Sequence, residues 1–78
     1  MQKKSLNEFN AEFQASINNG EFEESISILS TGITQYPNEN KLKLNLGNVY
    51  KVLGQIDNAI NVYTTLLSTS LKNIANNN

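Results

Sequence analysis

The sequence predicts an all-α fold of four helices, arranged as two tandem helix–turn–helix units. Apolar residues recur at intervals of three and four along the 78 residues, which is the spacing of one face of a helix. Glycine or proline interrupts this spacing at Gly20, Pro37 and Gly54. No segment alternates apolar and polar residues with the period of two typical of a half-buried strand. Because the interruptions are short, we expect neighbouring helices to run antiparallel.

The first expected helix begins near Ser5 and ends near Gly20. Ser5 and Glu8 have the spacing of a capping box, in which each side chain accepts a hydrogen bond from the backbone amide of the other residue. Asn18, Asn19 and Gly20 tolerate the left-handed dihedral angles that end a helix. The apolar stripe of this helix consists of Leu6, Phe9, Phe13 and Ile17.

The second and third expected helices are separated at Tyr36 and Pro37, because a residue before proline avoids helical dihedral angles. Asn38 or Asn40 is expected to cap the third helix, and Gly54 is expected to end it. The apolar stripe of the second helix is Phe22, Ile26, Leu29 and Ile33, and that of the third is Leu42, Leu46, Val49 and Leu53.

The fourth expected helix begins near Asp57, a residue type that favours the N-cap position. The last residues, 74–78, have the sequence IANNN and are expected to fray. The whole chain, 1–78, is expected to form one small domain. The apolar stripe of the fourth helix consists of Ile56, Ile60, Tyr63 and Leu67.

The two halves of the chain form an internal repeat. The segment NGEFEESISIL aligns with LGQIDNAINVY without a gap, so that Gly20 falls on Gly54. This spacing matches the helix–turn–helix period of about 34 residues that is typical of tetratricopeptide repeats. The first unit, about 6–39, resembles that family at Gly20, Ser25 and Pro37. The second unit, about 40–73, resembles it at Leu46, Gly47, Tyr50, Gly54, Ala59 and Tyr63. The resemblance implies a short α-solenoid of two repeats, to which the segment SLKNIA could add a partial C-terminal capping helix.

Gly47 lies inside the third expected helix, where glycine costs about 1 kcal/mol relative to alanine. We therefore expect its missing side chain to allow a neighbouring helix to approach closely, with Ala59 and its neighbours packing against the gap. Gly20 and Gly54 are expected to turn the chain between paired helices.

The composition argues against an enzyme and against a bound cofactor or metal ion. The chain contains neither histidine nor cysteine, which removes the commonest general base, the thiolate nucleophile and the commonest metal ligands. The carboxylates of Glu21, Glu23 and Glu24 are expected to complement a helix dipole and stay solvated. The three tyrosines are expected to pack.

Charge and hydropathy also exclude two classes of partner. The net charge of −1 and the absence of arginine argue against nucleic acid, because no basic stripe is available to neutralise phosphates. No stretch approaches the ~20 apolar residues that span a bilayer, and the N-terminus lacks the apolar run of a signal peptide. These features favour a cytoplasmic protein.

Resemblance to tetratricopeptide proteins implies a scaffold or adaptor whose first helices line a concave groove for an extended peptide or a partner helix. Asparagine side chains can bond both the donor and the acceptor of a peptide backbone, and Lys41 and Lys51 could receive a carboxylate. The alternative is that these polar side chains only solvate one face. The expected groove residues are Asn7, Asn10, Gln14, Ile17, Lys41, Leu44, Asn45, Asn48 and Lys51.

Two other functions stay open. The chain could self-associate as a homodimer through the apolar edge of its last helix, because stacked repeats normally bury such an edge on a neighbour. It could also be the helical targeting piece of a larger enzyme system. The expected edge consists of Val62, Leu66, Leu67, Leu71 and Ile74.

Overall fold

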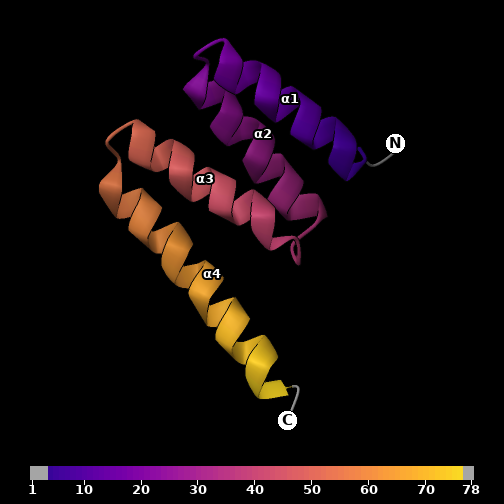
Figure 1. The fold of residues 1–78 in the computed structure, drawn as a ribbon, viewed down its shortest axis with the longest axis vertical. Coiled ribbons are helices and arrows are strands. Elements are labelled where there is room, and N and C mark those ends of the chain that lie inside the picture. The colour runs from indigo at the N-terminus through magenta and orange to yellow at the C-terminus, as the bar shows by residue number, and fades with distance from the viewer. Residues whose placement is uncertain (1–3, 77–78) are drawn as a thin grey trace.

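The computed structural model describes residues 4–76, with side chains from residue 4 to residue 68, and confirms the all-α fold (Figure 1). Each helix packs most closely on its neighbours in the chain, so the helices form a staircase, and no other pair of helices comes as close within the described residues. The four helices are α1 (Leu6–Asn18), α2 (Phe22–Gln35), α3 (Asn40–Val52) and α4 (Ile56–Asn76). They form two antiparallel hairpins, α1–α2 and α3–α4.

The two hairpin turns have the same backbone geometry. Gly20 has a φ of +72° and Gly54 a φ of +78°, a left-handed conformation that glycine adopts without steric cost. The hydrogen bonds that close the turns recur at equivalent positions. In the first turn, the amide of Glu21 donates to the carbonyl of Ser16 (2.8 Å), and that of Gly20 donates to Ile17 (3.0 Å). In the second turn, the amide of Gln55 donates to the carbonyl of Tyr50 (2.9 Å), and that of Gly54 donates to Lys51 (3.0 Å). This pattern is the Schellman motif. The alignment of the two glycines therefore corresponds to a structural repeat.

The signals for the ends of α1 and α2 are confirmed. The backbone amide of Ser5 donates to the Glu8 carboxylate (3.0 Å), and the amide of Glu8 donates to the Ser5 hydroxyl (3.2 Å), which completes the capping box. Helix α2 ends at Gln35, directly before Tyr36 and Pro37. Of the three residues expected to tolerate left-handed angles at the end of α1, only Gly20 adopts them. Asn19 stays in the right-handed region with a φ of −89°.

The caps expected for α3 and α4 are wrong. Glu39 occupies the N-cap position of α3 without a side-chain hydrogen bond, and Asn40 is already the first helical residue. Helix α4 begins at Ile56, so Asp57 lies inside its first turn. Because the Schellman motif ends at Gln55, the chain re-enters a helix two residues earlier than an N-cap at Asp57 would place it.

Helix α4 is longer than expected. It runs through residues 74–76, where fraying was expected, and SLKNIA continues it without folding back as a separate cap. No glycine or proline follows Gly54, so nothing in the sequence breaks the helix. Helix α4 therefore has 21 residues against 14 in α2, and its C-terminal half projects past the start of α3 (Figure 1).

The core lies between α1, α2 and α3. Gly32 is buried in the middle of α2, where an added Cβ would lie 3.3 Å from a methyl carbon of Leu42 and 3.4 Å from the ring of Phe9. The absence of a side chain at this position lets Phe9 of α1 and Leu42 of α3 both approach the backbone of α2 at one point. The buried apolar side chains are Phe9, Phe13, Leu29, Leu42, Leu46, Val49 and Ala59.

The crossing of α3 and α4 is built around Gly47. A Cβ at this position would lie 2.5 Å from Cε1 of Tyr63, closer than any real contact. The prediction that Gly47 allows close packing is confirmed, but the side chain nearest to it belongs to Tyr63 and not to Ala59. The hydroxyl of Tyr63 also donates to the side-chain oxygen of Asn48 (2.5 Å), which fixes the ring over the glycine.

Tyr36 anchors the N-terminal end. Its hydroxyl donates to the backbone carbonyl of Lys4 (2.5 Å), and its ring meets that of Phe9 edge-on with 6.2 Å between centroids. These contacts fasten the start of α1 to the end of α2.

Candidate peptide-binding groove and exposed apolar face

A groove runs between α1 and α3 and consists of two hollows. The hollow near the start of both helices has a volume of about 260 Å³ and a mostly polar lining. Amide side chains from α1 face Lys41 and Glu39 across it, so that hydrogen-bonding groups and both signs of charge are available. Its lining residues are Leu6, Asn7, Asn10, Glu39, Lys41 and Leu42.

The hollow near the ends of α1 and α3 has a volume of about 220 Å³ and a mostly apolar lining. Asn45 and Asn48 supply its polar groups, and Asn48 accepts the hydrogen bond from Tyr63 described above. The floor of this hollow is therefore tied to α4 through one side chain. Its lining residues are Phe13, Ile17, Phe22, Asn45, Asn48, Val49 and Val52.

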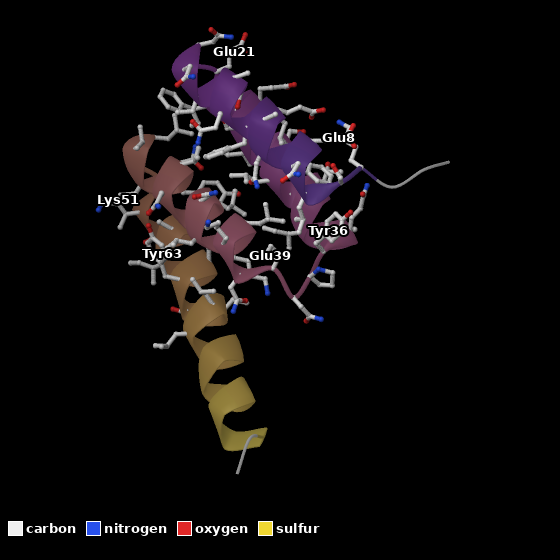
Figure 2. The ribbon with its side chains drawn as sticks, turned by 45° about the vertical axis from the view of Figure 1, so that its right-hand side comes forward. Glu8, Glu21, Tyr36, Glu39, Lys51 and Tyr63 are labelled. Carbon is white, nitrogen blue, oxygen red and sulfur yellow. The ribbon has the colours of Figure 1, made fainter. Side chains whose placement is uncertain are left out.

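Six of the nine residues expected in the groove line these hollows: Asn7, Asn10, Ile17, Lys41, Asn45 and Asn48. The structure does not bring Gln14, Leu44 or Lys51 into either hollow. Gln14 is exposed on α1, and Lys51 points away from α1 (Figure 2). Leu44 precedes Gly47 by three residues, which places it on the side of α3 that faces α4. Apolar Val52, at the end of α3, lines the groove although sequence reasoning did not select it.

A third hollow, of about 250 Å³, lies on the opposite side of α3 and was not predicted. It is apolar except at its rim, where Lys43 and Asn61 lie. Lys43 is two residues from Lys41, a spacing that places the two lysines on different faces of the helix. The hollow is lined by Ile33, Lys43, Leu46, Asn61, Val62 and Thr65.

One face of α4 is apolar and exposed. The exposed fractions are 50% for Ile56, 54% for Ile60 and 60% for Leu67, and we call these three residues the bare face of α4. The sequence pattern assigned all three to the apolar stripe of the fourth helix, but it could not indicate that no helix covers them.

The edge expected for self-association overlaps this face only in part. Leu67 belongs to the bare face, whereas Val62 packs against the core cluster and Leu66 is half-buried. The side chains of Leu71 and Ile74 lie outside the described residues. Ile56 and Ile60, which were not in the expected edge, belong to the exposed face because they lie on the same side of the helix as Leu67.

The acidic side chains do not converge on a site. Glu21, Glu23 and Glu24 are exposed around the start of α2, and no group of three possible metal ligands occurs in residues 4–76. Glu8 has a pKa below its usual value, chiefly because the backbone amide of Ser5, and then its hydroxyl, bond the carboxylate. This shift belongs to the helix cap and is not a sign of catalysis. No helix in the described part of the chain is long and apolar enough to cross a bilayer.

Comparison with known proteins adds no relative. No family model matches the sequence, and neither a curated protein nor a solved structure matches the chain significantly.

Proposed function

We propose that the chain is a non-enzymatic protein-interaction module, a scaffold or adaptor of the tetratricopeptide kind, that captures a peptide in the groove between α1 and α3. One observation carries the proposal: a polar hollow and an apolar hollow follow one another along the same pair of helices. A binding site of this type combines apolar surface with a few polar groups that fix the orientation of the ligand.

The chemistry of the groove favours an extended peptide. The amides of Asn7 and Asn10 can each bond a backbone carbonyl and a backbone N–H of the ligand, and these contacts do not depend on its sequence. The Lys41 ammonium can receive an acidic side chain or a terminal carboxylate. At the other end, the surfaces of Ile17 and Val52 can cover one apolar side chain of the peptide.

Assignment to the tetratricopeptide family is part of the proposal. It is supported by the turn hydrogen bonds, which recur with the period of that family, and by the left-handed glycine at the same place in each hairpin. The small residues at the helix crossings, Gly32 and Gly47, fit the close packing that stacked hairpins require.

The proposal is tested with peptides selected from a displayed random library against the immobilised chain. Each selected peptide is titrated into the ¹⁵N-labelled chain, and chemical shift changes are expected at Asn7, Asn10, Lys41 and Asn45. The variant Lys41→Ala is expected to weaken binding by at least about tenfold, a loss of about 1.4 kcal/mol.

Lys43→Ala provides the matched control, because it removes the same charge from the opposite face of the same helix. It is expected to leave the affinity unchanged within about twofold, as a surface substitution outside the site should. The groove assignment is wrong if Lys43→Ala weakens binding and Lys41→Ala does not. In that case the ligand occupies the hollow between α2, α3 and α4.

A further inference from the structure

A further hollow, of about 360 Å³, opens where α2 connects to α3. It shares Leu6 and Glu39 with the polar hollow of the groove, so it continues the groove beyond the start of α1. Tyr36 and Glu39, the first and last residues of the connection, both line it (Figure 2). We call it the turn hollow, and its lining residues are Leu6, Gln35, Tyr36, Pro37, Asn38 and Glu39.

The Glu39 carboxylate is not neutralised by the described part of the chain. Glu39 is the N-cap of α3 but makes no side-chain hydrogen bond there, and it forms no ion pair with another described residue. Lys4 lies close to Tyr36, but its ammonium pairs with the carboxylate of Glu12 (2.8 Å). Lys41 lines the neighbouring hollow and also leaves Glu39 unpaired. The half-buried Glu39 carboxylate is therefore available to a cation from another molecule.

Buried oxygen atoms without a donor gather at the same connection. Among the described side chains, the buried oxygens that lack a hydrogen-bond partner are Gln35 Oε1 and Asn40 Oδ1, one on each side of the connection. A buried acceptor without a donor costs free energy, which a ligand that supplies N–H groups can recover. Gln35 lines the turn hollow, and because its oxygen is shielded from solvent, the side chain must rotate to meet a donor there.

The rest of the lining distinguishes between kinds of cation. Leu6, Tyr36 and Pro37 supply apolar walls, which suit the methylene stem of a long basic side chain better than a bare ion. A divalent metal ion would need several oxygen ligands. No group of three possible metal ligands occurs in residues 4–76. The turn hollow therefore has the chemistry of a site for a lysine or arginine side chain.

We infer that the turn hollow binds a basic side chain of the peptide that occupies the groove, an inference that rests on the proposed function. Its positive charge lies against the Glu39 carboxylate, and Gln35 supplies a further acceptor. Lys41, two residues after Glu39, receives a negative charge of the same peptide in the adjoining hollow. The groove therefore selects a peptide with a basic and an acidic group close together, and the order of these groups fixes the direction in which the peptide lies.

Selection from a displayed random peptide library tests the charge preference. The wild type should enrich lysine or arginine at one fixed position, and Glu39→Gln should lose that enrichment. Glu39→Lys reverses the charge and should enrich aspartate or glutamate at the same position. Peptides that bind the wild type with no basic residue enriched overturn this inference but leave the proposed function intact. Failure to select any peptide overturns both.

A double-mutant cycle measures the contact itself. Replacing the basic residue of a selected peptide by norleucine should weaken binding to the wild type about fivefold, near the upper end for a partly exposed ion pair. The same replacement should have little effect on binding to Glu39→Gln. Gln35→Glu adds a second carboxylate and should strengthen binding of the basic peptide alone.

Glu23→Gln is the matched control. It removes an equal charge from an exposed position at the start of α2, at the far end of that helix from the turn hollow. This variant should keep the full preference for the basic residue over norleucine. Equal loss of the preference in Glu23→Gln and Glu39→Gln would reduce the effect to net charge and overturn the inference. Weaker binding of the basic peptide to Gln35→Glu would overturn it as well.

Discussion

The two hairpins share a backbone but fill it with side chains of opposite size. The first hairpin has Phe13 on its first helix and Leu29 on its second, both in the buried core. At the corresponding positions, the second hairpin has Gly47 and Tyr63, with the tyrosine ring occupying the space above the glycine. Both hairpins therefore keep the two helices close together. The large side chain that fills the space between them can come from either helix.

A second pair of positions shows a similar exchange. Ser16 and Ser25 are buried and contact each other through their hydroxyls (2.5 Å) in the first hairpin. Ser16 also reaches the carbonyl of Phe13, and Ser25 that of Glu21, so two hydroxyl protons serve three contacts. In the second hairpin, the corresponding residues are Tyr50 and Ala59, so no pair of hydroxyl-bearing small residues occurs there. A small residue on the second helix is the feature that both hairpins keep.

The largest difference between the hairpins is burial of the second helix. Leu29 of α2 is 1% exposed, whereas Leu67 of α4, which corresponds in the repeat to the half-buried Ile33, is 60% exposed. We expect Leu29→Ala to destabilise the fold by about 3 kcal/mol, because it opens a cavity between three helices. Leu67→Ala is expected to change stability by less than about 0.5 kcal/mol. Urea denaturation followed by circular dichroism, at a concentration where the chain is monomeric, measures both. Equal losses would mean that α4 is as well covered as α2.

The exchange of bulk at the helix crossing gives the next prediction. Gly47→Ala gains about 1 kcal/mol of helix propensity but forces its methyl group into the Tyr63 ring, at a cost of about 1–3 kcal/mol. We expect a net loss of stability of about 1 kcal/mol, seen as a lower midpoint of thermal unfolding.

Tyr63→Leu restores at this crossing the residue type of the first hairpin. In that background, Gly47→Ala should be neutral or stabilising by up to about 1 kcal/mol, because the ring is gone. A double-mutant cycle with no coupling between the two positions would show that the ring and the glycine do not share the space.

The helix starts provide the smallest contrast. Helix α1 begins with the capping box of Ser5 and Glu8, whereas Glu39 begins α3 without a side-chain hydrogen bond. Ser5→Ala is expected to cost about 1 kcal/mol, and Glu39→Ala, the control, should cost much less. Comparable losses in the two variants, measured by urea denaturation, would remove the distinction between the two starts.

The same cap makes stability depend on pH. Because bonds from Ser5 lower the pKa of Glu8 in the folded chain, the ionised carboxylate stabilises the fold above the pKa that it has when unfolded. That contribution is lost as the pH falls through the lowered pKa, below the value of about 4.3 usual for glutamate. As the pH falls through this range, the free energy of unfolding of the wild type should decrease relative to that of Glu8→Gln. A difference that is constant with pH would contradict it.

Local chemistry made the turns predictable. Gly20 and Gly54 supply left-handed angles, and Pro37 ends α2, because these residue types act through their own backbone geometry. The caps assigned to Asn40 and Asp57 failed because the preceding turn, and not the polar residue, fixes where each helix resumes. Glycine and proline therefore predicted where helices end, whereas polar residues next to a turn did not predict where the next helix begins.

Side-chain surroundings were less predictable than the elements. The pattern placed Ile60 and Leu67 on an apolar stripe, but a stripe does not indicate whether a neighbour covers it. Likewise, the repeat pattern predicted most of the residues that line the groove on α1 and α3. It did not predict that Leu44 and Lys51 lie outside the groove, because this depends on how α3 is rotated about its own axis. That orientation depends on side-chain volumes at the crossings, here on Tyr63 and Gly47.

The staircase of helices has a consequence for how the chain folds. Since every helix packs most closely on its sequence neighbours within the described residues, most helix–helix contacts close short loops of chain. Low contact order of this kind accompanies folding in microseconds to milliseconds. It also means that opening can begin at either end and spread one helix at a time, as in a one-dimensional lattice. The projecting half of α4 would then exchange its amide protons first, and α2, held on both sides, would exchange last.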